Sequence, residues 1–430
     1  MIFSKILHMM IHFLSTIALV SSASASYHFR HPASRRQVSK SPSTSTSPWS
    51  GLTDQLDGWV LSSSKGFAFT VGNSSGVQYQ YAKNKFSMHE KIETASTSKW
   101  PMAMMFVGLV QDGTISSLDA FASDYVPWWS SSRTCQNVST CDAKGNITIR
   151  QLLSFTSGFD DGEVPGGGGG SNATNCLDNS ATGNFVACAQ QIYGALNLTG
   201  SPGKTFAYNS IHLQLMGVVA HYATKGQLGI QDIFHKYYVV PYGMNETTCG
   251  DPGDTNPEIA VCLQTTGYDY QKFLQAQLTY SVLDKALVEE SEKNYTPFLT
   301  NDTVFTIYGL YSFGHWLECY DSSYGFTDDC ATANIHSDPG AFGYYPLIDR
   351  KNSYYMQVVA YESGKGYPLS GIPEYLRLAS KPLVDAVMSG EDTIVNGDSV
   401  FAHHTSSLKS LTIADVNYIT NCALNPLTCL

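Results

Sequence analysis

The 430-residue sequence lacks several patterns, and each absence disfavours a class of protein. None of its ten cysteines forms a Cys-x-x-Cys pair, so neither a zinc site nor a thiol-redox site is predicted. Lys and Arg number 25 against 36 Asp and Glu, and the net charge of −11 disfavours nucleic acid as a partner. The glycine run 166–170 is not followed by Lys-Ser or Lys-Thr, which indicates a surface loop rather than a phosphate-binding loop.

Long hydrophobic runs are also missing. After the N-terminus, no stretch approaches the ~20 apolar residues of a membrane helix, so no stable membrane span is expected. The N-terminus itself has Lys5, an apolar run from Met9 to Val20 and the small-residue sequence Ala23-Ser24-Ala25. This order is typical of a secretory signal peptide covering residues 1–25, with an uncleaved anchor as the alternative. The protein is therefore predicted to be secreted, or to reside in the lumen of the secretory pathway.

Cysteines and glycosylation sequons fit that location. The cysteines fall into neighbouring pairs, each of which could close a short loop as a disulfide, although sequence alone does not fix the connectivity. The pairs are Cys135 and Cys141, Cys176 and Cys188, Cys249 and Cys262, Cys319 and Cys330, and Cys422 and Cys429. Asn-x-Ser/Thr sequons, which predict N-glycosylation, occur at Asn73, Asn137, Asn146, Asn172, Asn197, Asn245, Asn294 and Asn301.

The order of predicted elements indicates an α/β (α+β) fold whose sheet is assembled from both ends of the chain. A flexible leader over 26–51 is followed by a short helix over 52–61 and a hairpin with strands 67–71 and 77–81. Further strands are expected over 343–348 and 354–361, followed by a helix over 373–388. Between them, about 112–310 is predicted to be an inserted, mainly helical region. The main domain is thus 52–385, and 386–430 is a C-terminal extension.

A serine and a lysine stand three residues apart, at Ser96 and Lys99, just before the apolar stretch 102–110. On a helix they lie about one turn apart, and a lysine amine desolvated by that stretch could accept the proton of the hydroxyl. The same spacing occurs at 62–65 and 406–409, so partners elsewhere must distinguish the three. Pro101 predicts that the helix begins late or is distorted there.

Two other patterns are better explained structurally. Gly72-Asn73-Ser74-Ser75-Gly76 fits the Gly-x-Ser-x-Gly nucleophile motif, but a strand rather than a helix follows it, so a hairpin tip is predicted. His403-His404 has no carboxylate or cysteine at ligand spacing, and a solvated tail is the preferred interpretation.

Three later segments supply partners for Ser96. The segment 149–159, which contains Leu-Leu-Ser-Phe-Thr-Ser-Gly-Phe, is a short helix ending in a turn. A Pro-Gly turn at 202–203 leads to Tyr208-Asn209-Ser210 before the helical run 211–221. Finally, His336-Ser337-Asp338-Pro339-Gly340-Ala341 enters a strand.

With these segments, the chain resembles the serine β-lactamase and penicillin-binding-protein group, most closely its class C, D-alanyl-D-alanine carboxypeptidase and esterase-like branch, over about 52–385. That resemblance implies an antiparallel sheet flanked by helices, with an inserted helical region. It also implies that Ser96 is the acylated nucleophile, that Lys99 accepts its proton, and that Tyr208 moves the proton to and from the leaving group. Ser210 stands where Asn is commoner, and His336 would line the opposite strand.

The oxyanion that forms during acyl transfer requires two backbone N–H donors. Ser96 could supply the first. Pro339 has no N–H, so Gly340 or Ala341 is the candidate for the second. A phenol close to cations favours its anionic form, so either Tyr208 or Lys99 could be the resting base.

The sequence therefore predicts a secreted serine hydrolase that acts through an acyl-enzyme, without a metal or organic cofactor, on a small-molecule or peptide substrate. The family often has a lysine on the strand where this chain has His336. The histidine reduces the fixed positive charge available to a substrate carboxylate, which favours an ester or small amide over a penicillin. The alternatives are a β-lactamase or D-alanyl carboxypeptidase, a catalytically inactive binding protein of the same fold, and a glycosylated surface-coat protein. The oligomeric state is left open.

Overall fold

The computed structural model describes residues 47–58, 66–135, 142–162, 172–178, 183–299, 309–318, 334–361 and 371–390. Its described helices are α2 (Ser50–Gly58), α3 (Lys99–Gln111), α4 (Ile149–Leu153), α5 (Phe185–Ala195), α6 (Ile211–Ala223), α7 (Ile230–Phe234), α8 (Val240–Tyr242), α9 (Gly267–Thr279), α10 (Lys285–Ser291) and α12 (Gly371–Ser389). Its described strands are β1 (Phe67–Asn73), β2 (Gly76–Ala82), β3 (Ile92–Glu93), β4 (Thr248–Cys249), β5 (Leu263–Thr265), β6 (Leu310–Tyr311), β7 (Trp316–Glu318), β8 (Ile335–Ser337), β9 (Tyr345–Asp349) and β10 (Tyr354–Ala360).

The main sheet joins the two ends of the described chain, as predicted. Within the described residues it has seven antiparallel strands in the order β2-β1-β10-β9-β8-β7-β6. The early strand β1 pairs directly with the late strand β10, from Phe67 opposite Ala360 to Asn73 opposite Tyr354. Strand β10 is buried along its whole length, whereas most of β2 is partly or fully exposed. This difference fits a central and an edge position in a sheet covered on both faces.

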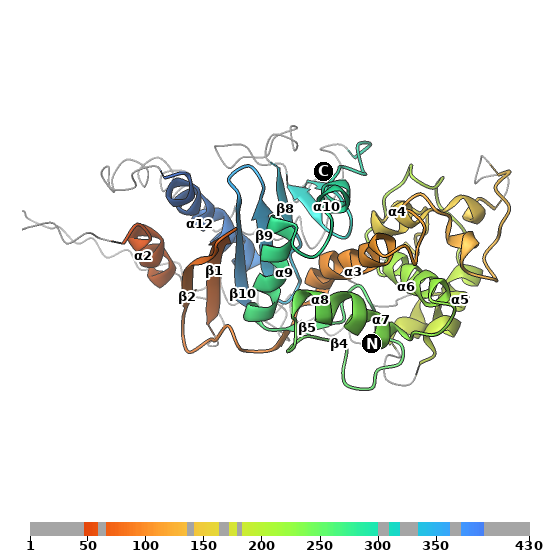
Figure 1. Cartoon of the computed structure of the whole chain (residues 1–430), viewed down its shortest axis with the longest axis horizontal. Helices are drawn as coiled ribbons and strands as arrows, with labels where there is room; N and C mark the ends of the chain where they lie inside the picture. Colours follow the sequence, from red (N-terminus) through yellow and green to blue (C-terminus); the bar gives the residue numbers. More distant parts are fainter. Residues whose placement is uncertain are drawn as a thin grey trace, which may run out of the picture.

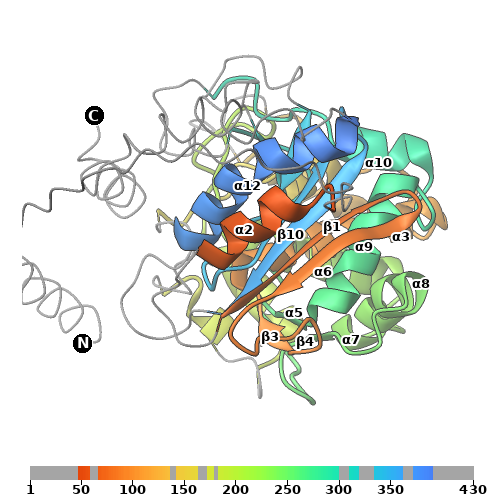
Figure 2. The same cartoon turned by 90° about the vertical axis from the view of Figure 1, so that its left-hand side faces the viewer.

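Helices cover both faces of this sheet. Helices α2 and α12 lie side by side on one face, and α9 lies on the other, with α3 beyond it (Figures 1 and 2). Leu56, Leu376 and Val384 of the first pair are buried in a cluster with Phe69 and Val358 of the sheet. Burial of these apolar side chains is the main force that attaches α2 and α12 to the sheet.

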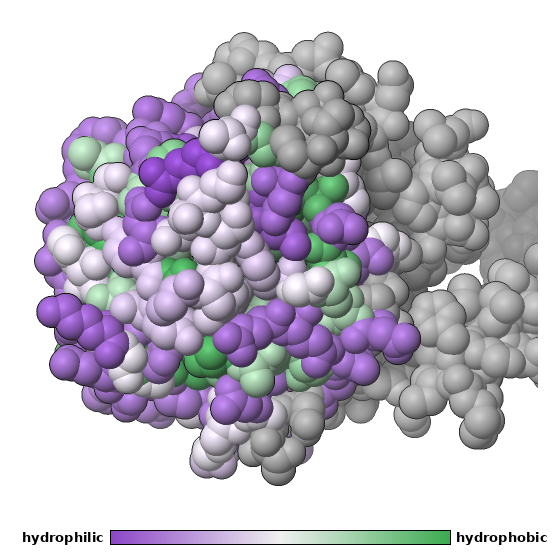
Figure 3. Space-filling model, turned by 90° about the vertical axis from the view of Figure 1, so that its right-hand side faces the viewer, coloured by the Kyte–Doolittle hydropathy of each residue, from purple (hydrophilic) through white to green (hydrophobic). Residues whose placement is uncertain are grey.

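Helix α3 is the central helix of the helical side of the molecule. Nearly every residue from Lys99 to Leu109 is buried, so the helix has no solvent-facing stripe. Helix α6 contacts α3, α4 and α5, and it is also apolar throughout most of its length. The side of the molecule at the right of Figure 1, viewed in Figure 3, shows hydrophobic residues only as small patches between hydrophilic ones. The apolar residues of this half are thus largely inside.

The predicted elements are confirmed in outline. The hairpin forms β1 and β2, the late strands are β9 and β10, and the last predicted helix is α12. The predicted first helix begins earlier, at Ser50, inside the stretch assigned to the leader. The short strands β3, β4 and β5 form a second sheet. The sequence does not predict these strands, nor the short strands β6, β7 and β8 of the main sheet. Strands of two or three residues carry too little alternation to be recognised from a sequence.

Two of the predicted disulfides are confirmed, Cys176–Cys188 and Cys249–Cys262. Cys135 is also disulfide-bonded. The other predicted cysteines lie outside the described residues: Cys141, Cys319, Cys330, Cys422 and Cys429. No helix in the described part of the chain is both long and apolar enough to cross a membrane.

The glycosylation sequons keep their status as predictions. Asn172, Asn197 and Asn245 are exposed, and Asn73, Asn146 and Asn294 are half-buried. Asn137 and Asn301 lie outside the described residues, as do the predicted signal peptide and His403-His404.

Candidate active site

A tight turn presents Ser96, the predicted nucleophile. Strand β3 ends at Glu93, and Ala95 then takes a left-handed conformation with φ of 50°, which is unfavourable for a residue with a Cβ. Residues Ala95–Ser98 form the 3-10 helix η1, which continues directly into α3. The side chain of Ser96 therefore faces a cavity of about 390 Å³ although the residue is only 7% exposed. The strained backbone conformation of Ala95 thus lies directly before Ser96, which lines the cavity.

The amine of Lys99 lies next to this serine. Its Nζ donates to Ser96 Oγ at 3.0 Å and to the carbonyl oxygen of Ala260 at 3.2 Å. Burial lowers the pKa of Lys99 to about 8, while the carboxylates of Asp338 and Glu258 act in the opposite direction. A substantial fraction of neutral amine is therefore present near pH 8, and it is within direct proton-transfer distance of the hydroxyl.

The distortion predicted from Pro101 is present at the start of α3. The N–H of Lys99 bonds to the carbonyl of Ser96 three residues back, and the N–H of Trp100 turns instead to Asp338 Oδ2, 2.8 Å away. The carbonyl of Thr97, for which Pro101 offers no N–H, accepts the hydroxyl of Tyr270 at 3.1 Å. Asp338 and Tyr270, from distant segments, thus supply the hydrogen-bond partners that these two backbone groups lack within the helix.

Asp338 is an unexpected acid at this site. It is fully buried, and its second oxygen, Oδ1, has no hydrogen-bond partner among the described residues. Burial raises its pKa well above the ordinary value, against the effects of the Trp100 N–H and of Lys99. The sequence assigns no role to this residue. The structure shows that it anchors the start of α3.

Tyr208 lies against the same two residues. Lys99 Nζ is 4.8 Å from the centre of its ring, and its hydroxyl is hydrogen-bonded with Ser96. Burial and the charge of Asp338 raise its pKa above the ordinary value. The expectation that nearby cations favour the phenolate is therefore wrong here, because desolvation is the larger effect. Tyr208 is therefore a neutral hydroxyl at rest, and Lys99, whose pKa is lowered, is the stronger of the two candidates for the base.

The segment 149–159 positions Tyr208. The N–H of Ala207 donates to the carbonyl of Phe155 at 3.1 Å, and the Phe155 ring packs 6.0 Å from that of Tyr208. Buried His212, which sequence analysis did not single out, joins both segments: it bonds to the Ala207 carbonyl at 2.8 Å and to Ser157 Oγ at 3.0 Å. Because burial lowers the pKa of His212 to about 3, the ring is neutral, donates to the carbonyl from Nε2 and accepts the hydroxyl at Nδ1.

A second acid, Glu258, lines the cavity and was missed from the sequence. It lies on the loop 250–262 between β4 and β5, far along the chain from Ser96. Its carboxylate accepts a hydrogen bond from the hydroxyl of Ser210, which also lines the cavity. Burial raises the pKa of Glu258, opposed by Ser210 and by Lys99. No motif signals such a residue, because only the folded loop brings it to the serine.

His336 is buried on β8 and does not belong to the cavity lining among the described residues. Its ring nitrogens lie 3.1 Å from His315 Nε2 and 3.1 Å from Asn334 Oδ1. Burial and the charge of Arg350 lower its pKa to about 3, so the ring is neutral. The structure thus brings Ser96, Lys99 and Tyr208 together but places the ring of His336 in another hydrogen-bond network.

The two candidates for the second oxyanion donor differ. The N–H of Gly340 is occupied, since it donates to the carbonyl of Tyr344 at 2.8 Å. A Cβ at Gly340 would lie 2.0 Å from the carbonyl oxygen of Thr94. Glycine therefore allows this loop to approach the backbone just before η1, the turn that carries Ser96. Ala341, the next residue, is exposed and lines the cavity with Ser96. Of the two, Ala341 is the better placed.

The fold and the serine, lysine and tyrosine that it brings together define a serine hydrolase of β-lactamase-like fold. The family model for beta-lactamase matches residues 50–367, and the chain belongs to that family. It is accordingly an enzyme of the serine hydrolase type. No curated protein sequence matches the chain.

Solved structures show the same fold. A candidate beta-lactamase from Bacteroides dorei is 23% identical with a TM-score of 0.58, over 78% of this chain and 99% of that one. EstCE1, a hydrolase with promiscuous acyltransferase activity, is 14% identical with a TM-score of 0.58, over 74% and 93%. The LovD9 mutant of simvastatin synthase from Aspergillus terreus is 15% identical with a TM-score of 0.56, over 80% and 100%. At these identities the similarity supports the fold and does not select a substrate.

Proposed function

We propose that this chain is a secreted, glycosylated hydrolase that cleaves an ester or small amide through an acyl-enzyme on Ser96. The observation that carries the proposal is the 3.0 Å contact between Lys99 Nζ and Ser96 Oγ, next to the Tyr208 hydroxyl and open to a cavity. Direct proton transfer requires this hydrogen-bond distance. The confirmed disulfides Cys176–Cys188 and Cys249–Cys262 support an oxidising location.

In acylation, Ser96 Oγ attacks the substrate carbonyl while its proton passes to the neutral amine of Lys99. The N–H groups of Ser96 and Ala341 are the proposed donors to the oxyanion. When the tetrahedral intermediate collapses, Tyr208 gives its proton to the leaving oxygen or nitrogen and recovers one from the Lys99 ammonium. Water then attacks the acyl-enzyme, its proton passes to Lys99 and on to Ser96 Oγ, and the free acid leaves.

The cavity favours an ester or amide over a substrate with a carboxylate beside the reacting group. None of the described residues that line it is Lys, Arg or His. The neutral, buried ring of His336 adds no positive charge from β8. A penicillin or a D-alanyl peptide would therefore bring its carboxylate to a wall without a cation, so β-lactamase or carboxypeptidase activity is the second candidate.

The test is intact-mass labelling with a fluorophosphonate. The wild-type protein should gain one adduct, and Ser96→Ala should lose it. Ser74→Ala is the matched control, because it removes the same hydroxyl from the exposed hairpin tip of the competing Gly-x-Ser-x-Gly pattern. A label retained by Ser96→Ala would refute the assignment, and a wild-type protein that never labels would favour an inactive binding protein or a surface-coat protein. Nitrophenyl esters, nitrocefin and D-Ala-D-Ala peptides then rank the substrates.

A further inference from the structure

The cavity that holds Ser96 has a wall of one charge sign. Its described lining includes the carboxylates of Glu93, Asp251, Asp254 and Glu258, with no Lys, Arg or His among the same residues. A cavity lined by one sign of charge within low-dielectric walls concentrates counter-ions and repels like charges. Since any molecule acylated on Ser96 must enter here, this wall acts on the substrate itself.

Three of these acids accept hydrogen bonds from neutral groups. Asp251 accepts Gln264 Nε2 at 3.2 Å, Asp254 accepts the N–H of Asp251 at 2.9 Å, and Glu93 accepts the Tyr361 hydroxyl at 3.1 Å. None of the four acids forms an ion pair in the part of the chain that the structure describes. A carboxylate accepts about four hydrogen bonds, so each retains capacity for a donor from a ligand.

Glu258 is the acid most directly connected to the reacting atoms. It accepts the hydroxyl of Ser210, two residues after Tyr208, and its charge raises the pKa of Lys99. The peptide oxygen of Ala260, two residues further along the same loop, is a direct acceptor for Lys99 Nζ. Glu258 is therefore coupled to the residues around Ser96 through Ser210 and Lys99.

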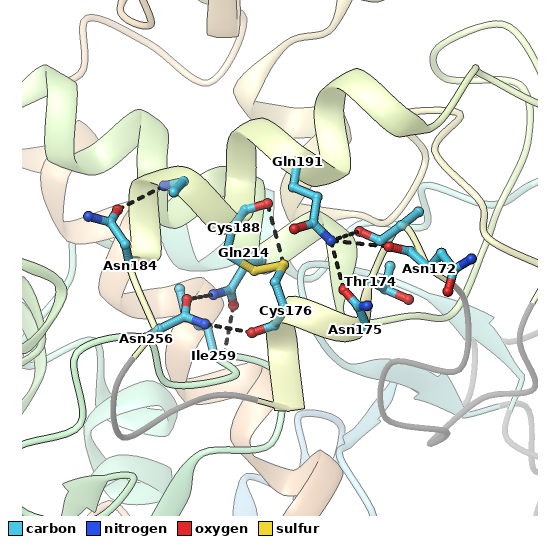
Figure 4. The surroundings of a disulfide bond; sticks show 12 residues. Asn172, Thr174, Asn175, Cys176, Asn184, Cys188, Gln191, Gln214, Asn256 and Ile259 are labelled. Carbon is cyan, nitrogen blue, oxygen red and sulfur yellow. Dashed lines mark hydrogen bonds between the residues drawn. A yellow bond between two sulfur atoms is a disulfide. The ribbon is translucent and has the colours of Figure 1, made fainter.

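The protein holds Glu258 firmly in this position. Buried Gln214 of α6 donates to Asn256 Oδ1 and accepts the N–H of Ile259 (Figure 4). It also donates to the carbonyl of Pro257, so hydrogen bonds are made on both sides of Glu258. Asn256 in turn donates to the carbonyl of Cys176 at 2.8 Å. Such a fully bonded buried network fixes one conformation of the loop.

We propose that the catalytic cavity selects substrates by charge, accepting esters or amides that carry an ammonium group on the acyl side and disfavouring those that carry a carboxylate, with Glu258 as the specificity-determining acid. This inference rests on the proposed function, because it concerns the substrate of the same serine. It narrows the substrate class from any small ester or amide to a cationic one.

The test compares three nitrophenyl esters of similar size: 4-(trimethylammonio)butanoate, its neutral isostere 5,5-dimethylhexanoate, and the monoester of adipic acid. We expect kcat/KM for the cationic ester to exceed that of the isostere at least tenfold, and the anionic ester to be the poorest. In Glu258→Gln the ratio of cationic to neutral kcat/KM should fall at least fivefold. The ratio cancels any effect of the substitution on Lys99, because both esters use the same base.

Glu289→Gln on α10 is the matched control, since it removes an exposed acid far from the cavity lining, and it should leave the ratio unchanged. If Glu258→Gln does not fold, Asp251→Asn on the exposed side of the same wall is the second variant, and added NaCl should lower the wild-type ratio through screening. A wild-type enzyme that hydrolyses all three esters without charge preference overturns this inference alone. Failure to hydrolyse any ester, together with an unlabelled Ser96, overturns the proposed function as well.

Discussion

The hydroxyl of Tyr270 on α9 donates a hydrogen bond to the backbone carbonyl of Thr97, 3.1 Å away and fully buried. This carbonyl would otherwise lack a partner, because the residue four positions later is Pro101. Thr97 stands between Ser96 and Lys99, the proposed nucleophile and base. A side chain more than 170 positions away thus completes the turn that sets their relative orientation.

Tyr270→Phe should reduce both stability and activity. Loss of the hydroxyl leaves a buried carbonyl unpaired, and we expect the free energy of unfolding to fall by about 1–2 kcal/mol. Since the Thr97 carbonyl lies in the turn that carries Ser96, kcat should fall by a larger factor than the factor by which KM changes. Denaturant unfolding and ester kinetics measure the two effects. Tyr268→Phe is the control, because within the described residues its hydroxyl accepts one hydrogen bond, from the exposed Gln80 amide. An equal loss there would contradict the role of Tyr270.

The rate of acylation should rise with pH through the pKa of Lys99. Burial lowers that pKa from 10.5 to about 8, so below this pH the amine is protonated and unable to accept the serine proton. We expect kcat/KM for a neutral ester to fall tenfold per pH unit below about 7 and to level off above about 9. Lys99→Met should abolish this limb along with most of the activity. A profile that stays flat from pH 6 to 9 would show that another group is the base.

Removing the Cys249–Cys262 disulfide should impair catalysis because it closes the loop that carries Glu258 and the Ala260 carbonyl. The double variant Cys249→Ser/Cys262→Ser should lose about 2–4 kcal/mol of stability and roughly tenfold in kcat/KM. Cys176–Cys188 is a matched control for stability, since the sequence separations are 13 and 12 residues. Its removal should cost similar stability and a smaller loss of activity, because it acts on the Glu258 loop indirectly, through the hydrogen bond from Asn256 to the Cys176 carbonyl. Equal activity losses would show that the effect is not specific to the cavity loop.

The packing of helix α12 against the sheet should depend on the buried charge of Lys381 for its stability. Lys381 Nζ lies 2.6 Å from Asp349 Oδ2 of β9 and 3.0 Å from the hydroxyl of Tyr354 of β10. Lys381→Met leaves the buried aspartate without this cation, and we expect a loss of about 3–5 kcal/mol in thermal or denaturant unfolding. The activity of the folded variant should be unchanged, because α12 lies on the sheet face opposite α9 and outside the cavity lining. Lys285→Met in an exposed pair should leave stability unchanged, and a loss of that size there would contradict the argument.

Apart from the sheet assembled from both ends of the chain, which follows from the order of the elements, the parts of the fold predicted correctly depend on neighbours in sequence. The hairpin β1–β2 was recognised from alternation around Gly72 to Gly76, and two disulfides from cysteines 12 and 13 positions apart. The distorted start of α3 followed from Pro101, because proline lacks an N–H whatever surrounds it. The short strands β6, β7 and β8 cannot be recognised from the sequence, because their pairing depends on the rest of the sheet rather than on their own residues.

By itself, the sequence singled out Ser96 as the predicted nucleophile and left Lys99 and Tyr208 as candidates for its base, because the three-residue spacing at a helix start brings Ser96 and Lys99 within one turn and a later motif supplies the tyrosine. Only the tertiary structure decided the protonation and surroundings of that pair. Burial, which depends on residues from the whole chain, lowers the pKa of Lys99 and raises that of Tyr208. The tertiary structure also brings Asp338 and Glu258 to the site. No local sequence pattern specifies which loop closes over a cavity, so neither acid could be predicted.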